Sequence, residues 1–346
     1  MNFSHSEEQT LLKDMLSRFL ADTPDASWEQ IADLGVIGAL FGEDQGGLGG
    51  GGFDIALVFE ELGRAGCIAP LLDCALLPGL ALAGAGRDLE DIIAGKARYG
   101  FAHGEVAARY DNTWVETRAN EGRLNGAKTV VVGAENAQHF IVSARVDGQV
   151  DAAEGINLYL VEADAAGLRL NAYEVAQGGR AADLTLNDTP AELLLEEAAP
   201  MIGDLAAAGL LAQSADTLGA MVKAASLTQD YLTTRKQFGV AIGRFQALAH
   251  RLADMMLEVE QARSAVILAA STLHTPAPER DRHGSACKNL MGRAGRFVAE
   301  EAIQMHGGIG MTDEFELGHY AKRIIMADHR FGDVDHHMEN FIALSA

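Results

Sequence analysis

The chain changes its hydrophobic period twice, and this order constrains its fold more than any other feature. Residues 1–97 and 191–346 carry apolar side chains at helical spacing, whereas residues 98–190 consist of short runs of β-forming residues. A chain of 346 residues is also long enough for more than one hydrophobic core. We therefore predict an α+β protein of three domains, with boundaries near residues 97 and 190.

The N-terminal part is expected to be a helical domain. Ser6 and Gln9 have the spacing of a capping box, and apolar residues follow at helical spacing. A second helical pattern runs over 28–40, and a third over 53–65. The glycine-rich segment 46–52 between them is a turn rather than a phosphate-binding loop, because no Gly-Lys-Ser/Thr follows and no strand precedes it.

The middle part reads as an all-β domain. Turn dipeptides such as Asn125-Gly126 and Asp147-Gly148 separate runs rich in Val, Ile, Thr and aromatic residues. Short strands with turns about every ten residues are typical of an antiparallel barrel or sandwich. The strands are expected at 113–117, 129–132, 139–145, 156–161 and 184–186.

Long helices dominate the C-terminal part. Helical spacing predicts helices over 204–234, 244–273 and 285–305, which as neighbours would form a bundle. These segments are rich in Ala, Leu and Met around much of their circumference, and this pattern is unusual for the surface helices of a monomer. We therefore expect an oligomer, either of identical chains or with a homologous partner subunit.

Composition excludes several classes of protein. The net charge of −22 argues against nucleic acid or an anionic membrane as the main partner. The N-terminus lacks the pattern of a signal peptide, and no apolar run reaches 18 residues, so a cytoplasmic location is expected. Three cysteines, Cys67, Cys74 and Cys287, are too few for a disulfide framework.

No metal site is expected. No His or Cys cluster has zinc spacing. His336 and His337 are neighbours in sequence, so their rings point apart on any helix, and we expect them to be surface residues.

A connector between two long helices carries residues suited to a nucleotide. Arg235 could pair with an anion, Phe238 could stack on a flat ring, and Gln237 and Gln246 could bind polar groups. The same pattern is compatible with a plain helical hairpin whose charges are solvated. A second segment carries Gln304, followed by glycines that let a backbone approach a ligand closely, or that simply end a helix.

Taken together, these motifs resemble the acyl-CoA dehydrogenase family. The resemblance extends in order over nearly the whole chain and implies an N-terminal helical domain, a middle antiparallel β-barrel and a C-terminal four-helix bundle. It further implies an FAD enzyme of lipid metabolism that oxidises an acyl-CoA thioester to the trans-2-enoyl-CoA and passes electrons to an electron-transfer flavoprotein. The matching stretches are Phe3-Ser-His-Ser-Glu-Glu-Gln, Gly46-Gly-Leu-Gly-Gly, Glu60-Glu-Leu-Gly-Arg64, Gly122-Arg-Leu-Asn-Gly-Ala-Lys128, Arg-x-Gln-Phe-Gly with the following Phe-Gln, and Gln-x-x-Gly-Gly-x-Gly.

The resemblance assigns cofactor contacts to two segments. One set matches positions that contact the FAD phosphates and the ribityl or adenine groups; it comprises Arg235, Gln237, Phe238 and Gln246. The other set matches positions that close over the adenosine side, usually from a neighbouring subunit; it comprises Gln304, Gly307 and Gly308.

The chain departs from the family at the flavin ring. The middle-domain signature Thr-Glu-Pro-x-x-Gly-Ser-Asp is replaced over residues 102–111. The Trp-Ile-Thr that shields the ring and hydrogen-bonds to it corresponds to Val130–Val132, so a stacking partner and a hydroxyl donor are lost.

The catalytic glutamate of the family is also missing. Counting from Lys322 places Asp328 in its position, whereas aligning the segment Phe331-Gly-Asp with Glu-Gly-Thr places Phe331 there and leaves no base. Some relatives carry the base on the first long helix, near position 209, which is a glycine in this chain. Arg323 and Arg330 flank Asp328, and pairing with either would lower its pKa and weaken it as a base.

These features predict an acyl-CoA dehydrogenase or a subunit of one. The first possibility is a divergent subunit that works with a homologous partner chain. The second is an enzyme of identical subunits that uses Asp328. The third is a flavin-binding or flavin-free scaffold that stabilises a catalytic partner and has no activity alone.

Overall fold

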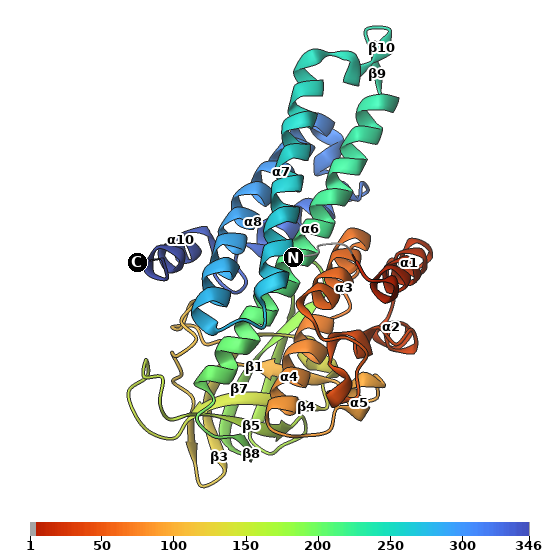
Figure 1. Ribbon diagram of the computed structural model, residues 1–346. Helices are drawn as coiled ribbons and strands as arrows, with labels where there is room; N and C mark the ends of the chain where they lie inside the picture. The colour runs from red at the N-terminus through yellow and green to blue at the C-terminus, as the bar shows by residue number, and fades with distance from the viewer. Residues whose placement is uncertain (1–4, 346) are drawn as a thin grey trace.

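The computed structural model describes residues 5–345, so the first two residues of the motif at Phe3 lie outside it. Three long helices form a column, with the N-terminal helices against one side and a β-sheet below them (Figure 1). The first long helix, α6 (Ala199–Thr234), runs from the sheet to the far end of this column.

Short helices make up the N-terminal part, as expected. Ser6 and Gln9 form the predicted capping box, since the Gln9 amide donates to Ser6 Oγ and Gln9 Oε1 accepts from the Ser6 amide. The helix expected over 28–40 is broken, because Gly35 has a φ of 73° and a 3₁₀ turn follows it. The helices are α1 (Glu7–Asp22), α2 (Trp28–Asp33), α3 (Gly52–Ala65), the π-helical turn η3 (Leu72–Leu76), α4 (Leu77–Gly84) and α5 (Glu90–Ile93).

Glycines allow α3 to lie directly against α6. A Cβ atom at Gly63 would be 1.9 Å from the Asp216 carbonyl oxygen, and one at Gly219 would be 2.0 Å from the Glu60 carbonyl oxygen. Real Cβ atoms do not approach other heavy atoms this closely. Any side chain at either position would therefore force the two helices apart. This crossing fixes the N-terminal helices on the column.

The middle sheet is mixed and open, so the predicted antiparallel barrel is wrong. Its order is β6-β7-β3-β2-β4-β5-β8, with β1 paired to β4, and the end strands β6 and β8 do not pair with each other. Strands β1 and β2 both run parallel to β4. The strands are β1 (Tyr99–Ala102), β2 (Arg118–Asn120), β3 (Arg123–Val132), β4 (His139–Arg145), β5 (Ile156–Glu162), β6 (Leu168–Glu174), β7 (Arg180–Pro190) and β8 (Glu192–Leu195).

The strand expected over 113–117 is not a strand. The buried Arg145 guanidinium donates to the carbonyls of Thr113 and Val115, at 2.8 and 3.2 Å, and so takes acceptors that a neighbouring strand would use. The other four expected strands lie within β3, β4, β5 and β7.

The C-terminal part is helical, as predicted. The three long helices pack on one another, and α9 packs on two of them. The four-helix bundle and the exact domain boundaries remain predictions. The elements are α6, the hairpin strands β9 (Lys236–Gln237) and β10 (Val240–Ala241), α7 (Gln246–Thr272), α8 (Ala277–His306), α9 (Leu317–Ala327) and α10 (Val334–Ala343).

Helix α6 is the core helix of the molecule. Among the described residues it is the one helix long and apolar enough to span a membrane, but 83% of its most apolar 18-residue window is buried within the protein. Burial by its neighbours accounts for its apolar composition. The three cysteines are free and buried, as expected for core residues.

Candidate functional site

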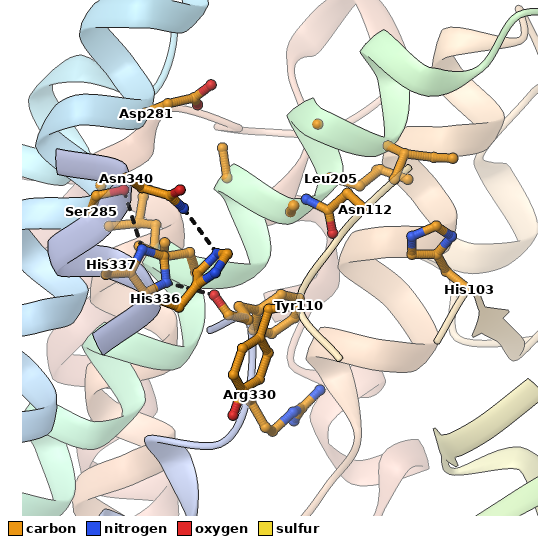
Figure 2. Close-up of a pocket in the computed structure, with 18 of the residues that line it drawn as sticks. His103, Tyr110, Asn112, Leu205, Asp281, Ser285, Arg330, His336, His337 and Asn340 are labelled. Atoms are coloured by element: carbon orange, nitrogen blue, oxygen red, sulfur yellow. Dashed lines mark hydrogen bonds between the residues drawn. The ribbon is translucent and has the colours of Figure 1, made fainter. Parts of the chain in front are cut away.

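A cavity of about 610 Å³ lies where the sheet, the first half of α6 and the C-terminal segment meet. Figure 2 shows His103 on one side of it and Ser285, His336 and His337 on the other. Apolar residues of α6 form much of the wall between them; they include Ile202, Leu205, Ala206, Leu210 and Leu211. The cavity therefore combines an apolar wall with polar groups at two sides, which is the usual character of a small-molecule site.

Phe331 lines this cavity at the position of the catalytic base in the alignment of Phe331-Gly-Asp with Glu-Gly-Thr. It belongs to the loop between α9 and α10, and its ring lies against Gly209 of α6. A Cβ atom at Gly209 would be only 2.5 Å from the ring atoms Cε1 and Cζ. Two of the three positions considered for a base, 331 and 209, thus face each other, and neither carries a carboxylate.

The loop that carries Phe331 is fastened by a buried lysine. Lys288 of α8 donates its ammonium protons to the carbonyls of Ala327, Asp328 and Gly332, at 3.1, 3.1 and 2.8 Å. Burial lowers the pKa of Lys288 to about 8, so it remains largely protonated at neutral pH. This anchor fixes the backbone on both sides of Phe331.

Asp328 lies outside the cavity. It caps the end of α9 and faces α8, where a Cβ atom at Gly292 would touch its Oδ1 at 2.2 Å. Its Oδ1 is 3.8 Å from the Lys288 ammonium, and burial raises its pKa despite that charge. The expected pairing with Arg323 or Arg330 is wrong, because those arginines bind other carboxylates.

The arginine partners are two buried aspartates. Arg323 donates to Asp216 of α6 at 2.6 Å, and Arg330 donates to Asp73 at 2.6 Å. Asp73 belongs to the π-helical turn η3 and lines the cavity, and burial raises its pKa against the effect of Arg330.

Every carboxylate that lines the cavity is paired with a cation. Besides Asp73 these are Glu105, 2.6 Å from the Lys128 ammonium, and Asp281, 2.8 Å from Arg280. A neighbouring cation lowers the pKa of a carboxylate and weakens it as a base, although at Asp73 burial outweighs Arg330 and raises the pKa. Among the described residues, the cavity therefore presents no carboxylate that is free of a cation to remove a proton from a bound ligand.

The adjacent histidines are not surface residues, contrary to expectation. His337 is 4% exposed, and its Nε2 lies 2.7 Å from the Phe331 carbonyl oxygen. His336 lines the cavity and is hydrogen-bonded to Asn340 (Figure 2). Burial lowers the pKa of His337 to about 4, so this imidazole is neutral at pH 7. Their rings meet edge-on with centroids 5.1 Å apart, so the expectation that they point apart is wrong. The described residues contain no cluster of three or more potential metal ligands.

The segment with Arg235 forms an exposed hairpin at the far end of the column (Figure 1). Phe238 is 90% exposed, has a φ of 53° and touches Phe245 edge-on. Arg235, Gln237 and Gln246 are exposed beside it. Arg235 forms no ion pair within residues 5–345. The structure therefore brings these four predicted contacts together on open surface.

The second predicted segment lies at the same end of the molecule. His306 at the end of α8 stacks on Tyr231 of α6 with ring centroids 4.5 Å apart, which holds the following turn beside the end of α6. Gln304, Gly307 and Gly308 are exposed there, and a Cβ atom at either glycine would meet nothing within 4 Å. We call residues 235–246 and 304–308 the distal tip.

The distal tip and the cavity are far apart in one chain. Leu211 lines the cavity and Arg235 follows the end of the same helix. At 1.5 Å per residue, the 24 positions between them span about 36 Å along the helix axis. The predicted cofactor contacts and the predicted base position therefore do not form one site within a single chain.

The order of elements agrees with the family comparison. The domain described as "Acyl-CoA dehydrogenase, N-terminal domain" matches residues 6–84, and "Acyl-CoA dehydrogenase, C-terminal domain" matches residues 207–339. Together these matches cover more than half of the chain. The protein belongs to the acyl-CoA dehydrogenase family.

This family consists of flavoprotein oxidoreductases, and its members match this chain from end to end. The probable acyl-CoA dehydrogenase YngJ of Bacillus subtilis is 27% identical over 91% of the chain and 92% of the relative. A solved structure described as the Tcur3481-Tcur3483 steroid ACAD variant is 26% identical, covers 98% of both chains and has a TM-score of 0.87. The FAD complex of PigA is 23% identical, covers all of both chains and shares the fold with a TM-score of 0.86.

Sequence reasoning missed several cavity residues of this acyl-CoA dehydrogenase. Asp73 and Ser285 sit in otherwise ordinary helical patterns and carry no signal of their own. His103 lies inside the altered flavin signature. That departure from the family pattern was the one available indication that this wall of the cavity differs from that of the family.

Proposed function

We propose that this chain is a subunit of an FAD-dependent acyl-CoA dehydrogenase that depends on a homologous partner chain for catalysis. The observation that carries the proposal is the contact between Phe331 and Gly209, which leaves positions 331 and 209 without a carboxylate, while Asp328, the third position considered, lies outside the cavity. The α-proton of an acyl-CoA thioester needs such a base, held within hydrogen-bonding reach. We infer that the partner's cavity supplies it.

The distal tip supports a shared flavin. An exposed guanidinium at Arg235 and an exposed ring at Phe238 suit a phosphate and a flat heterocycle, respectively. The open space over Gly307 and Gly308 lets a ligand approach the backbone. Because the tip lies far from this chain's own cavity, it would hold the adenosine side of an FAD whose ring lies in another subunit.

The residues of this chain's own cavity suit a flavin ring less well than the distal tip suits the adenosine side. Val130 lines the cavity in place of the family tryptophan and offers no aromatic ring, and Val132 offers no hydroxyl group. When bound, FAD accepts the hydride that leaves the β-carbon as the base takes the α-proton. In this chain the apolar wall of α6 would bind an acyl group and exclude water, while Lys288 holds the loop that blocks the base position.

The test compares the full chain alone with the complex that co-purifies with it, identified by mass measurement. We expect at least a dimer, bound flavin in the complex, and turnover of acyl-CoA with an electron-transfer flavoprotein or an artificial acceptor by the complex only. Arg235→Ala in this chain should weaken flavin binding by about 1.5–3 kcal/mol, the scale of a hydrogen bond to a charged group.

Arg244→Ala is the matched control, because Arg244 is an exposed arginine of the same tip that the family pattern does not assign to the cofactor. Vigorous turnover by the isolated chain would refute the need for a partner. A colourless complex that cannot be reconstituted with FAD would instead favour the scaffold function.

A further inference from the structure

A buried ion pair lies behind one wall of the cavity. The Lys128 side chain is fully buried and its ammonium is 2.6 Å from Glu105 Oε1. Glu105 also accepts hydrogen bonds from the amides of Glu116 and Thr117 and from the Thr117 hydroxyl. These four donors keep the carboxylate ionised, so Lys128 has a permanent partner.

All three protons of Lys128 are accounted for. They go to Glu105 Oε1 at 2.6 Å, to Ser143 Oγ at 2.9 Å and to the carbonyl of His103 at 3.2 Å. Burial lowers the pKa of Lys128 to about 8, which leaves it largely charged at pH 7. An ammonium group donates and never accepts, so Ser143 Oγ must be the acceptor of that contact.

The Ser143 hydroxyl is thereby directed at His103. Its oxygen lies 2.9 Å from His103 Nδ1, and Ser143 is fully buried, so no solvent competes for its proton. With Lys128 donating to this oxygen, the hydroxyl proton goes to Nδ1, which then acts as an acceptor. A neutral imidazole that accepts at Nδ1 carries its own proton on Nε2.

The remaining nitrogen of His103 has no fixed partner. Within residues 5–345, the ring of His103 makes one hydrogen bond, between Nδ1 and Ser143, and none at Nε2. Nε2 is also not among the buried polar atoms that lack a partner. The backbone of Asn112 is near enough to raise the pKa of His103 slightly, and it is the acceptor that competes for this proton. The ring lines the cavity, as Figure 2 shows.

We propose that His103 is a directional hydrogen-bond donor to a carbonyl oxygen of the cavity ligand, through an Nε2–H tautomer set by Lys128 and Ser143. Two ligands of this protein's proposed function carry such an oxygen: the flavin ring and the acyl thioester. Burial and the Lys128 charge lower the pKa of His103 to about 3, so the donor remains neutral throughout the physiological range. The choice of ligand rests on the proposed function, whereas the tautomer does not.

The tautomer is measured in the ligand-free protein by ¹⁵N NMR of labelled histidines. The signals that disappear in His103→Val belong to His103, one of 11 histidines. We expect an unprotonated Nδ1, a protonated Nε2 and no titration between pH 5 and pH 7. In Ser143→Ala the two tautomers should mix. A proton on Nδ1, or titration near the ordinary histidine pKa of about 6.5, would overturn the inference.

The ligand is identified by titrating the full chain with FAD and, separately, with octanoyl-CoA. His103→Val should weaken binding of one of the two by about threefold to tenfold, as expected for one lost hydrogen bond. His103→Gln, which keeps an amide donor, should restore part of the loss. Unchanged binding of both ligands in His103→Val, or binding of neither to the wild-type chain, would refute the donor role. Arg235→Ala and turnover of the complex test the proposed function separately.

Discussion

The two ends of helix α6 carry opposite kinds of site. Around its first half lies a partly open cavity in which each lining carboxylate is paired and Phe331 fills the space over Gly209. Beyond its last residue the distal tip leaves an aromatic ring and a guanidinium on open surface. The cavity end pairs its own carboxylates, whereas Arg235 at the tip forms no ion pair within residues 5–345.

Under the proposed function, the tip is the end that binds another molecule. Phe238 is a large aromatic side chain left exposed there, beside the exposed Arg235. Backbone conformation does not separate the two ends, since Phe238 at the tip and Phe331 at the cavity have φ values of 53° and 56°. Buried charges that are paired within the chain contribute to the stability of that chain. Substitutions at the cavity end should therefore change stability first, and those at the tip should change binding first.

The largest expected effect is on the buried ion pair of the cavity wall. Lys128→Met leaves the Glu105 carboxylate, 4% exposed, without its cation. Breaking such a pair costs about 3–5 kcal/mol of unfolding free energy, so the melting temperature should fall steeply. Lys236→Met at the exposed tip is the control and should change stability by less than about 0.5 kcal/mol. Equal decreases in melting temperature for the two variants would contradict the proposed difference between the cavity end and the tip.

The next effect concerns the blocked base position. Phe331→Glu places a carboxylate where the family carries its base, and a positioned base contributes on the order of 10²-fold or more to rate. We expect flavin-loaded chain to gain turnover of acyl-CoA on that scale, measured with an artificial electron acceptor. Phe331→Leu removes the ring without adding a base and should gain nothing. Identical rates for the two variants would mean that the cavity lacks more than a base.

Acid should destabilise the cavity end through its buried histidines. Burial lowers the pKa of His103 to about 3 and that of His337 to about 4, against about 6.5 in the unfolded chain. Below pH 6.5 the unfolded chain therefore binds protons that the folded chain cannot, and stability is lost as the pH falls through this window.

The melting temperature should accordingly be lower at pH 5 than at pH 7. His337→Gln should show a smaller drop over the same interval, since it removes one of the histidines whose pKa is lowered by burial. A drop of the same size in the variant would show that other groups cause the acid sensitivity.

The smallest effect is expected at Asp328. It faces α8 rather than the cavity, so Asp328→Asn should change neither flavin content nor turnover of the complex by more than about twofold. Asp216→Asn, which breaks a buried ion pair with Arg323, should by contrast lower stability clearly. A hundredfold loss of turnover in Asp328→Asn with flavin retained would identify Asp328 as the base after all.

Local patterns predicted the helices well and the sheet poorly. The capping box at Ser6 and the long helices depend on side chains only three or four positions apart, and such spacing can be read directly in the sequence. Strand pairing depends on contacts between distant segments. Strand β6 was not predicted at all, because its side chains are mostly exposed and lack a clear alternation.

The sequence offered candidates at the tip and missed the cavity. Arg235 and Phe238 lie in a short motif whose pattern is visible in the sequence, and their role as cofactor contacts stays a prediction. Burial of His337 depends on how α10 packs on α8, and the partners of Arg323 and Arg330 lie more than 100 positions away. No local pattern contains that information.

The contact between Gly209 and Phe331 also restricts the order in which this protein could change. A Cβ atom at 209 would lie 2.5 Å from the ring of Phe331, so any side chain there requires the ring to move or to be replaced by a smaller group. The order of substitutions therefore matters. Of the two mutational routes toward a carboxylate in this cavity, the one through position 331 meets no such obstacle, and the one through position 209 becomes easier once residue 331 is smaller.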